Sequence, residues 1–374
     1  MRKAKITNAP KVLVFAECGI GDLILGTPLF SSIRTALPGS RITVVLRPDI
    51  PREVLNENRD VETVLRYPQK SVLYFFPRVP VVLKNIFTDG INLAIELAFI
   101  FKLKFFRFDA SMHLCPGGAT GTALVTFLCG AKIRVGPAFK HRLELSKWCY
   151  THTVTWDNFR HVVENNLDNL RVLGFNKFDT SLKLFVNNAD RQKARDIFTN
   201  NSDNASTPLV GLHTGGGNSG KPYWPLDRFV RVARYLIENA ACRVAAFFGP
   251  QEPDALTAFE DAPVIPIVNM SIGVVFGIIE KCSLFISSDT GLGHAAAAFQ
   301  VPTLTLFGNG NQRKHEHWGN KNYAINKLPE AILTGYETGY SAGEAGKQAL
   351  ERISVDEVIA LLKNIFVELK VMHA

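Results

Sequence analysis

The sequence contains no pair of cysteines spaced as C-x-x-C, although it is 374 residues long. Its cysteines lie far apart along the chain: Cys18, Cys115, Cys129, Cys149, Cys242 and Cys282. This spacing argues against a zinc motif or a disulfide framework, and it is typical of reduced thiols that fill the core of a cytosolic protein.

Long uninterrupted apolar runs are also missing. Residues 79–106 are strongly apolar, but Lys84, Asp89, Gly90 and Glu96 interrupt them, so no stretch of about 20 apolar residues remains to cross a bilayer. Two interpretations stay open. The segment is either a core helix or a helix that rests on an anionic bilayer surface, because basic and aromatic side chains alternate at its end: Lys102, Lys104 and Arg107 next to Phe101, Phe105 and Phe106.

The N-terminus lacks the features of a complete signal peptide. Its apolar run is short and ends in Gly-Ile-Gly-Asp (19–22) instead of a small-residue cleavage site. We therefore expect a buried first strand at this end of the chain.

Positive charge is scattered and forms no Lys/Arg-rich run. The 42 Lys and Arg residues exceed the 34 Asp and Glu residues, which gives a net charge of +8. Such an excess favours anionic partners such as nucleotides, phosphorylated sugars or acidic membrane surfaces. Without a basic cluster, we expect no nucleic-acid partner.

What the sequence does contain is a repeated alternation of apolar strand-like runs and helical patterns. Continuous apolar strands between helices predict parallel sheets covered on both faces, and therefore an α/β protein with two Rossmann-like domains. The strand-like runs are 11–17, 41–47, 61–67, 110–115 and 132–136, followed by 208–214, 242–249, 264–268, 283–289 and 302–308. The helical patterns include 22–37, 158–174, 226–240, 272–281 and 292–300.

The polar segment 200–208 is the predicted domain boundary. It divides the chain into an N-terminal domain (1–200) and a C-terminal domain (201–350). A C-terminal segment (351–374) follows, with an amphipathic helix over 354–369 that begins with Ser354 as its cap and is expected to return to the first domain. Ligands of open α/β sheets bind at the carboxyl ends of the strands, so we expect the site in the cleft between the two facing domains.

Four glycine-containing segments follow predicted strands. In the first, Gly19 and Gly21 precede Asp22 at the start of a helix, where backbone N–H groups are free to bind an anion. The alternative is that Asp22 only caps the helix.

In the second segment, Asp289 and Thr290 lead into a helix whose first turn contains His294. The start of such a helix is a suitable place for a diphosphate. A capped helix with an incidental histidine is the alternative there. A metal site is disfavoured because no third ligand stands at a suggestive spacing.

The third segment, HTGGGNSGKPYWP (213–225), matches the beginning of a P-loop, G-x-x-x-x-G-K. A P-loop carries Ser or Thr after the lysine, but this chain has Pro222, and Pro225 restarts a helix near Leu226. We therefore interpret it as a phosphate-binding loop of another kind. The fourth segment, CPGGATGT (115–122), is either an anion-binding turn for an acceptor or a simple strand-to-helix turn.

These segments, in this order, resemble glycosyltransferase family 9, whose best-known members are bacterial ADP-heptose:lipopolysaccharide heptosyltransferases. The matching residues include Gly21-Asp22 to Pro28, HVVENNLDNLRVLGF (161–175), the LHTGGG loop (212–217) with its K and WP, and NMSIGVVFGIIEKCSLFISSDTGLGHAAAAFQVPTLTLFG (269–308). The resemblance spans residues 11–320 and implies the GT-B fold, two Rossmann-like domains that face each other across a cleft.

The resemblance also implies roles for individual residues. Asp22 is expected to be the catalytic base that deprotonates the acceptor hydroxyl, and Lys221 the cation on the donor diphosphate. The expected donor-binding residues are Thr214, Gly215, Lys221, Glu252, Met270, Asp289, Thr290, Gly291, Leu292 and His294. The acceptor candidates, which are weaker, are Gly19, Gly118 and Thr120.

The physical chemistry of transfer agrees with these roles. Inverting transfer needs a carboxylate to take the proton of the acceptor, and positive potential where charge builds on the departing diphosphate. Lys221 and the helix after Asp289 supply that potential, and the sequence has no Asp-x-Asp motif of metal-dependent transferases. We therefore expect no cofactor and no metal, and a closure of the domains that assembles the site.

The expected function is a metal-independent, inverting transfer of a sugar, most simply heptose from ADP-heptose, onto a lipopolysaccharide core or related glycan. The expected place is the cytoplasm or the cytoplasmic face of the inner membrane, with a lipid-linked or oligosaccharide acceptor. The alternatives are another nucleotide sugar, or a non-catalytic nucleotide- or glycan-binding protein of this fold. Two departures from the family bear on the donor: Pro222 and Tyr223 separate Lys221 from Trp224, and Gly293 stands where relatives carry a larger residue, which would enlarge the donor pocket.

Overall fold

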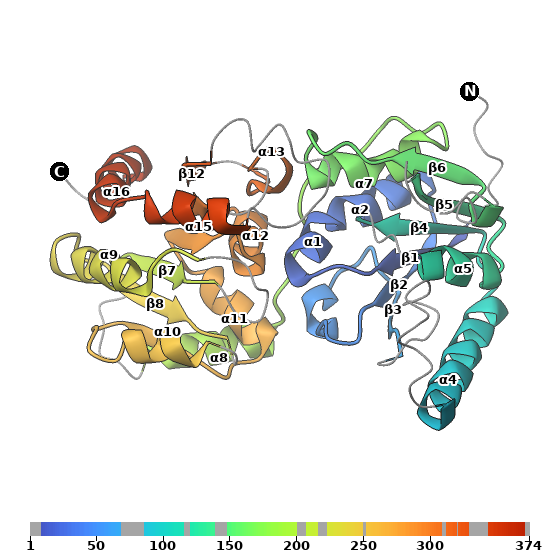
Figure 1. Ribbon diagram of the computed structural model, residues 1–374, viewed down its shortest axis with the longest axis horizontal. Helices are drawn as coiled ribbons and strands as arrows, with labels where there is room; N and C mark the ends of the chain where they lie inside the picture. Colours follow the sequence, from blue (N-terminus) through green and yellow to red (C-terminus); the bar gives the residue numbers. More distant parts are fainter. Residues whose placement is uncertain are drawn as a thin grey trace. The chain divides into compact units, whose positions relative to one another are not determined.

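The computed structural model describes residues 9–68, 86–115, 120–138, 148–199, 207–215, 223–249, 252–308, 312–319, 321–328 and 343–370. These residues form two units, Met1–Lys183 and Leu184–Ala374, each with its own parallel sheet (Figure 1). The expected α/β class with two Rossmann-like units is confirmed.

The sheet of the first unit has six strands in the order β3-β2-β1-β4-β5-β6, all paired in parallel. Its strands are β1 (Lys11–Ala16), β2 (Arg41–Leu46), β3 (Thr63–Arg66), β4 (Ala110–Leu114), β5 (Ile133–Ala138) and β6 (His152–Thr155). Its helices are α1 (Ile20–Leu25), α2 (Thr27–Ala36), the 3₁₀ helix η1 (Arg52–Leu55), α4 (Ile86–Phe105), α5 (Thr120–Leu128) and α7 (Val162–Arg171).

The sheet of the second unit repeats this order. It runs β12-β11-β10-β7-β8-β9, which is the same arrangement when each unit's strands are counted from its own first strand. Its strands are β7 (Leu209–His213), β8 (Arg243–Phe247), β9 (Ile265–Ile267), β10 (Leu284–Ser288), β11 (Thr303–Phe307) and β12 (Asn322–Asn326). Its helices are α8 (Asn188–Thr199), α9 (Leu226–Glu238), α10 (Pro253–Ala258), α11 (Ile272–Ile279), α12 (Gly291–Ala298), α13 (Gln312–His315), α15 (Gly343–Glu351) and α16 (Val355–Leu369).

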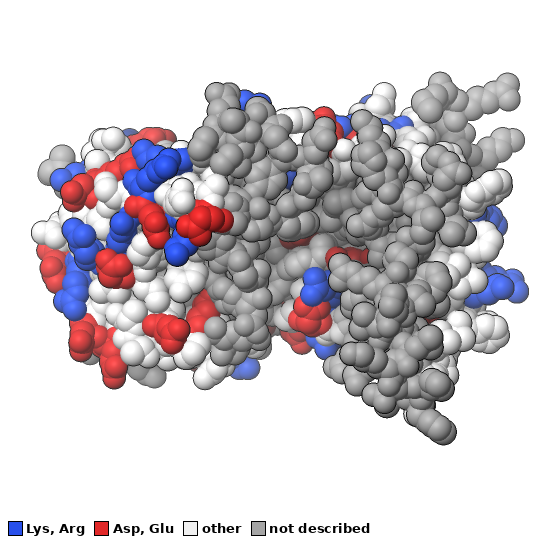
Figure 2. Space-filling view, viewed as in Figure 1, with Lys and Arg blue, Asp and Glu red and all other residues white. Residues whose placement is uncertain are grey.

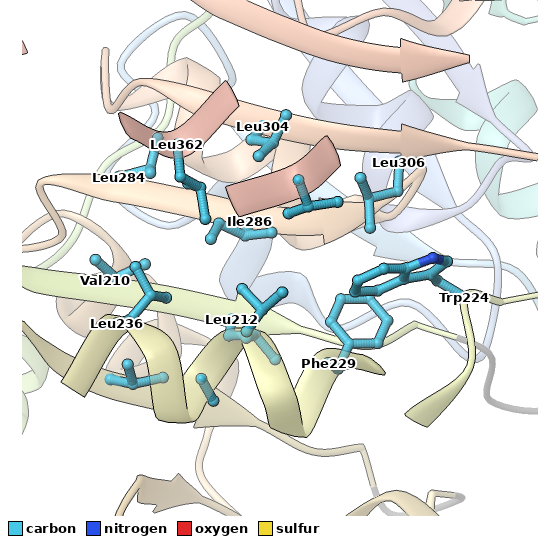
Figure 3. Close-up of a cluster of buried hydrophobic side chains, with 14 of the residues drawn as sticks. Val210, Leu212, Trp224, Phe229, Leu236, Leu284, Ile286, Leu304, Leu306 and Leu362 are labelled. Atoms are coloured by element: carbon cyan, nitrogen blue, oxygen red, sulfur yellow. The ribbon is translucent and has the colours of Figure 1, made fainter. Parts of the chain in front are cut away.

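The core of the second unit explains how the loop at 213–225 ends. Trp224 is fully buried, its Nε1 donates to the carbonyl of Ile353 at 2.9 Å, and its ring meets Phe229 edge to face (Figure 3). Pro225 is the N-cap of α9, as the sequence predicted for a helix restart near Leu226. The Trp-Pro pair therefore fixes the end of the loop to the core.

The division between the units lies earlier than predicted. Helix α8 lies within the predicted first domain (1–200) but packs against α11 of the second unit, and Arg191 pairs with Glu280 at 2.8 Å. The C-terminal helix α16 begins with Ser354 as its cap, as predicted. Its contacts differ from the expectation, however, because α16 packs against α9 and its buried side chains belong to the core of the second unit: Val358, Leu362, Ile365 and Phe366.

The predicted helix over 22–37 is two helices in the structure. Gly26 ends α1 and precedes α2, and a Cβ on Gly26 would lie 2.5 Å from Leu114 Cδ1. Pro28 stands in the first turn of α2, where its missing N–H costs no hydrogen bond. The break therefore lets the chain approach β4 closely.

The surface agrees with the scattered charge of the sequence. On the face of the second unit that Figure 2 shows, Lys and Arg side chains alternate with Asp and Glu side chains and form no single basic stripe. All six cysteines are buried free thiols, as predicted. None of the helices among the described residues combines the length and the apolar character that a membrane crossing requires.

Candidate functional site

In each sheet, the first strand pairs with the fourth strand of the same unit. Ala16 of β1 lies opposite Leu114 of β4, and His213 of β7 lies opposite Ser287 of β10. The strand order reverses at these pairs, and ligands of open α/β sheets bind beyond the carboxyl ends of such strands. Most of the predicted site residues directly follow one of these four strands.

Asp22 lies in the first turn of α1, after β1. The N-cap of α1 is Gly19, which has no side chain to cap the helix, so the alternative that Asp22 is the cap is wrong. A Cβ on Gly19 would meet no atom within 4 Å, which leaves the backbone at this turn open to a ligand. The half-buried carboxylate of Asp22 therefore has no capping role that would compete with a role in proton transfer.

Glu17 is a second carboxyl at the end of β1, and the sequence reasoning missed it. Thr122 Oγ1 donates to Glu17 Oε2 at 2.7 Å. Burial raises the pKa of Glu17 to about 7, against the lowering effects of the Thr122 hydrogen bond and the Arg47 charge. Near neutral pH, a large fraction of Glu17 is therefore protonated. An acidic residue directly after the apolar run 12–16 was the available signal.

The end of β4 is only partly defined as an acceptor site. Asn166 Oδ1 of α7 accepts from the backbone N–H of Cys115 at 2.9 Å. Thr120 is the first residue of α5, and its side chain is not described. Gly118 lies outside the described residues. The acceptor roles of these two residues stay predictions.

The end of β7 is locked to the end of β10. Ser288 Oγ donates to the carbonyl oxygen of Thr214 at 3.1 Å. Gly215 adopts a φ of +68°, and a Cβ there would lie 2.7 Å from Thr290 Cγ2. Both the positive φ and the close approach require glycine at this position. The predicted donor residues Thr214, Gly215 and Thr290 are thus brought together.

The hydroxyl of Thr214 is completely buried at this junction. Among the described residues, its Oγ1 has no hydrogen-bond partner. A buried hydroxyl without a partner costs free energy, typically about 1–3 kcal/mol, unless a ligand or water satisfies it. A polar ligand at this junction would remove that cost, and the donor-binding role of Thr214 stays a prediction.

Helix α12 begins directly after β10. Thr290 is its N-cap, and Thr290 Oγ1 accepts from the N–H of Gly293 at 3.5 Å. In its first turn, His294 Nε2 lies 3.7 Å from Asp289 Oδ1, with both side chains largely buried. The first N–H groups of a helix have no partner within the helix itself, and together with the helix dipole they favour an anion at this end. Gly291 and Leu292 provide the backbone of that turn.

The space next to Gly293 is filled, not open. A Cβ on Gly293 would lie 2.3 Å from Nε2 of the buried His317. The ring of His317 packs edge to face on His294 with centroids 4.9 Å apart, and its Nδ1 shares a 3.0 Å hydrogen bond with Thr305 Oγ1. The expected enlargement of the donor pocket by Gly293 is therefore wrong, because a histidine from a later segment occupies that space. No local pattern around His317 indicated this contact.

Glu252 stands at the N-terminus of α10, but its side chain turns back instead of capping the helix. Glu252 Oε2 accepts from the N–H of Gly249 at 2.8 Å and lies 3.9 Å from His213 Nε2. Burial lowers the pKa of His213, and the charge of Glu252 opposes that shift. Met270 is 41% exposed just before α11. The nucleoside contacts predicted for Glu252 and Met270 stay predictions.

Lys221, the predicted diphosphate cation, lies outside the described residues. Within the part of the chain that the structure describes, no three His, Cys, Asp or Glu side chains gather as metal ligands would. Asp289 and His294 form only a pair. The chemistry that these residues offer is therefore proton transfer at the end of β1 and anion binding at the ends of β7 and β10.

Comparisons with known proteins identify the family to which the chain belongs. Residues 98–334 match the model of glycosyltransferase family 9 (heptosyltransferase). The chain is 24% identical over 298 residues to lipopolysaccharide heptosyltransferase 3 of Escherichia coli K12, which covers 77% of this chain and 79% of that protein. A family 9 glycosyltransferase from Veillonella parvula has a similar fold, with a TM-score of 0.76, 20% identity, and coverage of 97% of this chain and 99% of that one. The ADP-heptose lipopolysaccharide heptosyltransferase II of E. coli has a TM-score of 0.71 at 17% identity, over 96% and 99% of the two chains.

Proposed function

The chain belongs to glycosyltransferase family 9, and we propose that it transfers heptose from ADP-heptose to a lipopolysaccharide core or a related glycan, with inversion at the anomeric carbon. One observation carries this proposal. The two units have the same strand order, and a carboxylate follows the first strand of one unit while a turn that contains Gly215 and the Thr214 and Ser288 hydroxyls lies at the first and fourth strands of the other.

The proposed reaction uses Asp22 as the general base. As the acceptor oxygen forms a bond to the anomeric carbon, Asp22 takes the hydroxyl proton and the bond from that carbon to the diphosphate oxygen breaks. ADP leaves with the electron pair of that bond. A positioned carboxylate contributes about 10²–10⁴-fold to such a step.

Charge on the leaving diphosphate is stabilised in the second unit. The free N–H groups at the start of α12 and the buried hydroxyl of Thr214 are suitable donors for phosphate oxygens. We propose that Lys221 adds positive charge there, so that the reaction needs no metal ion. The adenine nucleotide is the proposed carrier because ADP-heptose is named for a protein of similar fold.

We further propose that the acceptor is lipid-linked or an oligosaccharide, and that the enzyme works in the cytoplasm or at the cytoplasmic face of the inner membrane. A soluble nucleotide-sugar donor and an acceptor anchored in a bilayer can meet only at the surface of that bilayer. A peripheral contact with an anionic membrane therefore fits the proposed function.

Incubation of the purified chain with ADP-heptose and heptose-deficient lipopolysaccharide tests the proposal. The expected product carries one added heptose, with the anomeric configuration opposite to that of the donor by NMR, and excess chelator leaves the rate unchanged. Thermal shifts with ADP, UDP and GDP identify the carrier, since ligand binding stabilises the folded state. Retention of configuration would overturn the inverting mechanism, and loss of activity in chelator would overturn metal independence. A thermal shift confined to UDP or GDP would overturn ADP as the carrier.

A further inference from the structure

Helix α4 of the first unit exposes an unusually apolar face. Ile91, Ile95, Phe101 and Phe105 are 60%, 52%, 62% and 71% exposed. Ala94 and Ala98 lie between them on the same face, because residues three and four apart are neighbours on a helix. In Figure 1, α4 lies at the edge of the first unit, and its N-terminal end extends away from the sheet.

The opposite face of α4 holds the helix on the first unit. Leu103 is fully buried and Ile100 nearly so, and both belong to the core cluster that contains Phe15. Tyr67 Oη donates to the buried Glu96 carboxylate at 2.6 Å. The helix therefore has one face in the core of the first unit, while Ile91, Ile95, Phe101 and Phe105 on its other face are mostly exposed.

A continuous exposed apolar face on a folded chain marks an interaction site, because water contact with such a surface is unfavourable. Over residues 90–105, where the side chains of α4 are described, the only acidic residue is the buried Glu96. The exposed charges at this end of the helix are all positive: Lys102, Lys104 and Arg107. Phe101 and Phe105 contact each other edge to face, with ring centroids 4.8 Å apart, beside these basic residues.

Apolar and aromatic side chains next to basic groups, with no exposed acidic side chain over residues 90–105, match the boundary between the acyl chains and the anionic headgroups of a bilayer. The helix does not have the composition of a membrane-crossing segment. A helix of this kind lies in the plane of the interface with its apolar side toward the acyl chains.

We propose that the exposed face of α4 (Ile91, Ala94, Ile95, Ala98, Phe101 and Phe105, with Lys102, Lys104 and Arg107) docks the protein on an anionic bilayer surface. The inference rests on the proposed function in one respect: a lipid-linked acceptor is the reason for the enzyme to be at a bilayer. It deepens that function by naming the surface and the chemistry of its partner.

Vesicle sedimentation tests the proposal without donor or acceptor. The full chain should co-sediment with vesicles that contain phosphatidylglycerol, less with pure phosphatidylcholine vesicles, and less at high salt because screening weakens the basic contribution. Phe105→Glu should lower the partition coefficient at least about tenfold, because it removes an exposed aromatic side chain that the bilayer would bury and adds a charge to the interface. Val367→Glu is the matched control, since Val367 is 77% exposed on α16 of the second unit and should leave binding unchanged.

A second variant separates the two contributions. Lys102→Gln/Lys104→Gln keeps the apolar face and should bind both vesicle types almost equally.

Thermal stability and the ADP-induced thermal shift of each variant show that the chain is folded and that its donor site is intact, so failure of docking and failure of the proposed transfer are distinguishable. The proposal is overturned if the wild type binds neither vesicle type, or if Phe105→Glu binds vesicles as well as Val367→Glu does. It is also overturned if the wild type forms a concentration-dependent dimer that Phe105→Glu abolishes, because the face would then bind a second copy of the chain.

Discussion

The two units of this protein have sheets with the same strand order, but different chemistry at corresponding strand ends. After β1 of the first unit stand two carboxyls, Glu17 and Asp22, and a Gly19 turn with open space around it. After β7 and β10 of the second unit stand a buried hydroxyl at Thr214 and glycines in close contact with their neighbours. The first arrangement suits proton transfer in an accessible site, and the second suits a tightly held anion.

In the proposed reaction, one architecture carries two halves of the chemistry. The reversal of strand order supplies the place for a ligand in both sheets. The side chains and turns directly after the strands would decide what that ligand is, so under the proposal a single strand order serves both a base and a phosphate site.

The largest expected effect is the loss of catalysis when Asp22 is replaced, and it distinguishes the proposed base of the first unit from the proposed ADP site of the second. Asp22→Asn should lower kcat by about 10²–10⁴-fold, because the general base is lost, while the Kd for ADP stays unchanged. Steady-state transfer assays and calorimetric titration with ADP measure the two quantities. Asp227→Asn is the control, since Asp227 also lies in the first turn of its helix, α9 of the second unit. A loss of ADP affinity in Asp22→Asn would contradict the proposal that ADP binding belongs to the second unit alone.

The glycine contacts of the two units provide the next test. Gly293→Ala should lower the free energy of unfolding by about 1–3 kcal/mol and weaken ADP binding, because the new Cβ displaces the His317 ring and through it His294. Gly19→Ala should change the free energy of unfolding by no more than about 0.5 kcal/mol, since its Cβ meets open space. Urea denaturation of both variants compares them, and equal destabilisation would refute the contrast.

The contributions of Glu17 in the first unit and His213 in the second unit to the stability of the fold change in opposite directions with pH. Burial raises the pKa of Glu17 from its ordinary 4.5 to about 7, so the folded protein holds this proton more tightly than the unfolded chain. Its contribution to stability is therefore full below the unfolded pKa and is lost as the pH rises toward about 7. Burial lowers the pKa of His213, so the contribution of that residue is lost as the pH falls below its unfolded pKa.

Glu17→Gln tests this difference. The full shift of Glu17 corresponds to about 3 kcal/mol, and the partial exposure of the side chain reduces it to about 1–2 kcal/mol. The variant should be more stable than the wild type by about that amount at about pH 8, and no more stable at about pH 4. Urea denaturation at both pH values measures the difference. A gain in stability of the same size at both would show that the Glu17 proton is not involved.

The smallest effect concerns Thr214. Thr214→Val should leave the free protein as stable as the wild type or stabilise it by up to about 1 kcal/mol, because a buried hydroxyl without a partner among the described residues is removed. ADP affinity should fall by a few-fold to about tenfold, the value of one hydrogen bond. Ser288→Ala is the counterpart, since its hydroxyl already donates to Thr214 and its loss should destabilise the free protein by about 1 kcal/mol. If Thr214→Val leaves ADP affinity unchanged, Thr214 does not contact the donor.

The sequence predicted the central strands of both sheets because each is a continuous apolar run between helical patterns. All ten predicted strands are present. It missed β6 and β12, the strands at one edge of each sheet, which are short or largely polar and only partly buried. It also merged α1 with α2 and assigned α8 to the wrong unit, because the close approach of Gly26 to Leu114 and the packing of α8 on α11 are tertiary contacts.

The positions of the candidate site residues in the fold were predictable where they depend on short segments of the chain. Asp22, Thr214, Gly215, Asp289, Thr290 and His294 all follow strands at the reversal of the strand order, as the motifs indicated. The protonated state of Glu17 and the contact between His317 and Gly293 depend on burial and on residues distant in the sequence. No local pattern records those two properties.

The central claim is that the second unit holds the donor diphosphate while the first unit supplies the base. Hydrogen–deuterium exchange with and without ADP tests it most directly, because phosphate oxygens that accept from backbone N–H groups slow the exchange of those groups. The account predicts that ADP protects the amides after β7 (213–215) and at the start of α12 (290–294), and leaves residues 17–25 unchanged. Protection of residues 17–25 with none at 290–294 would contradict it.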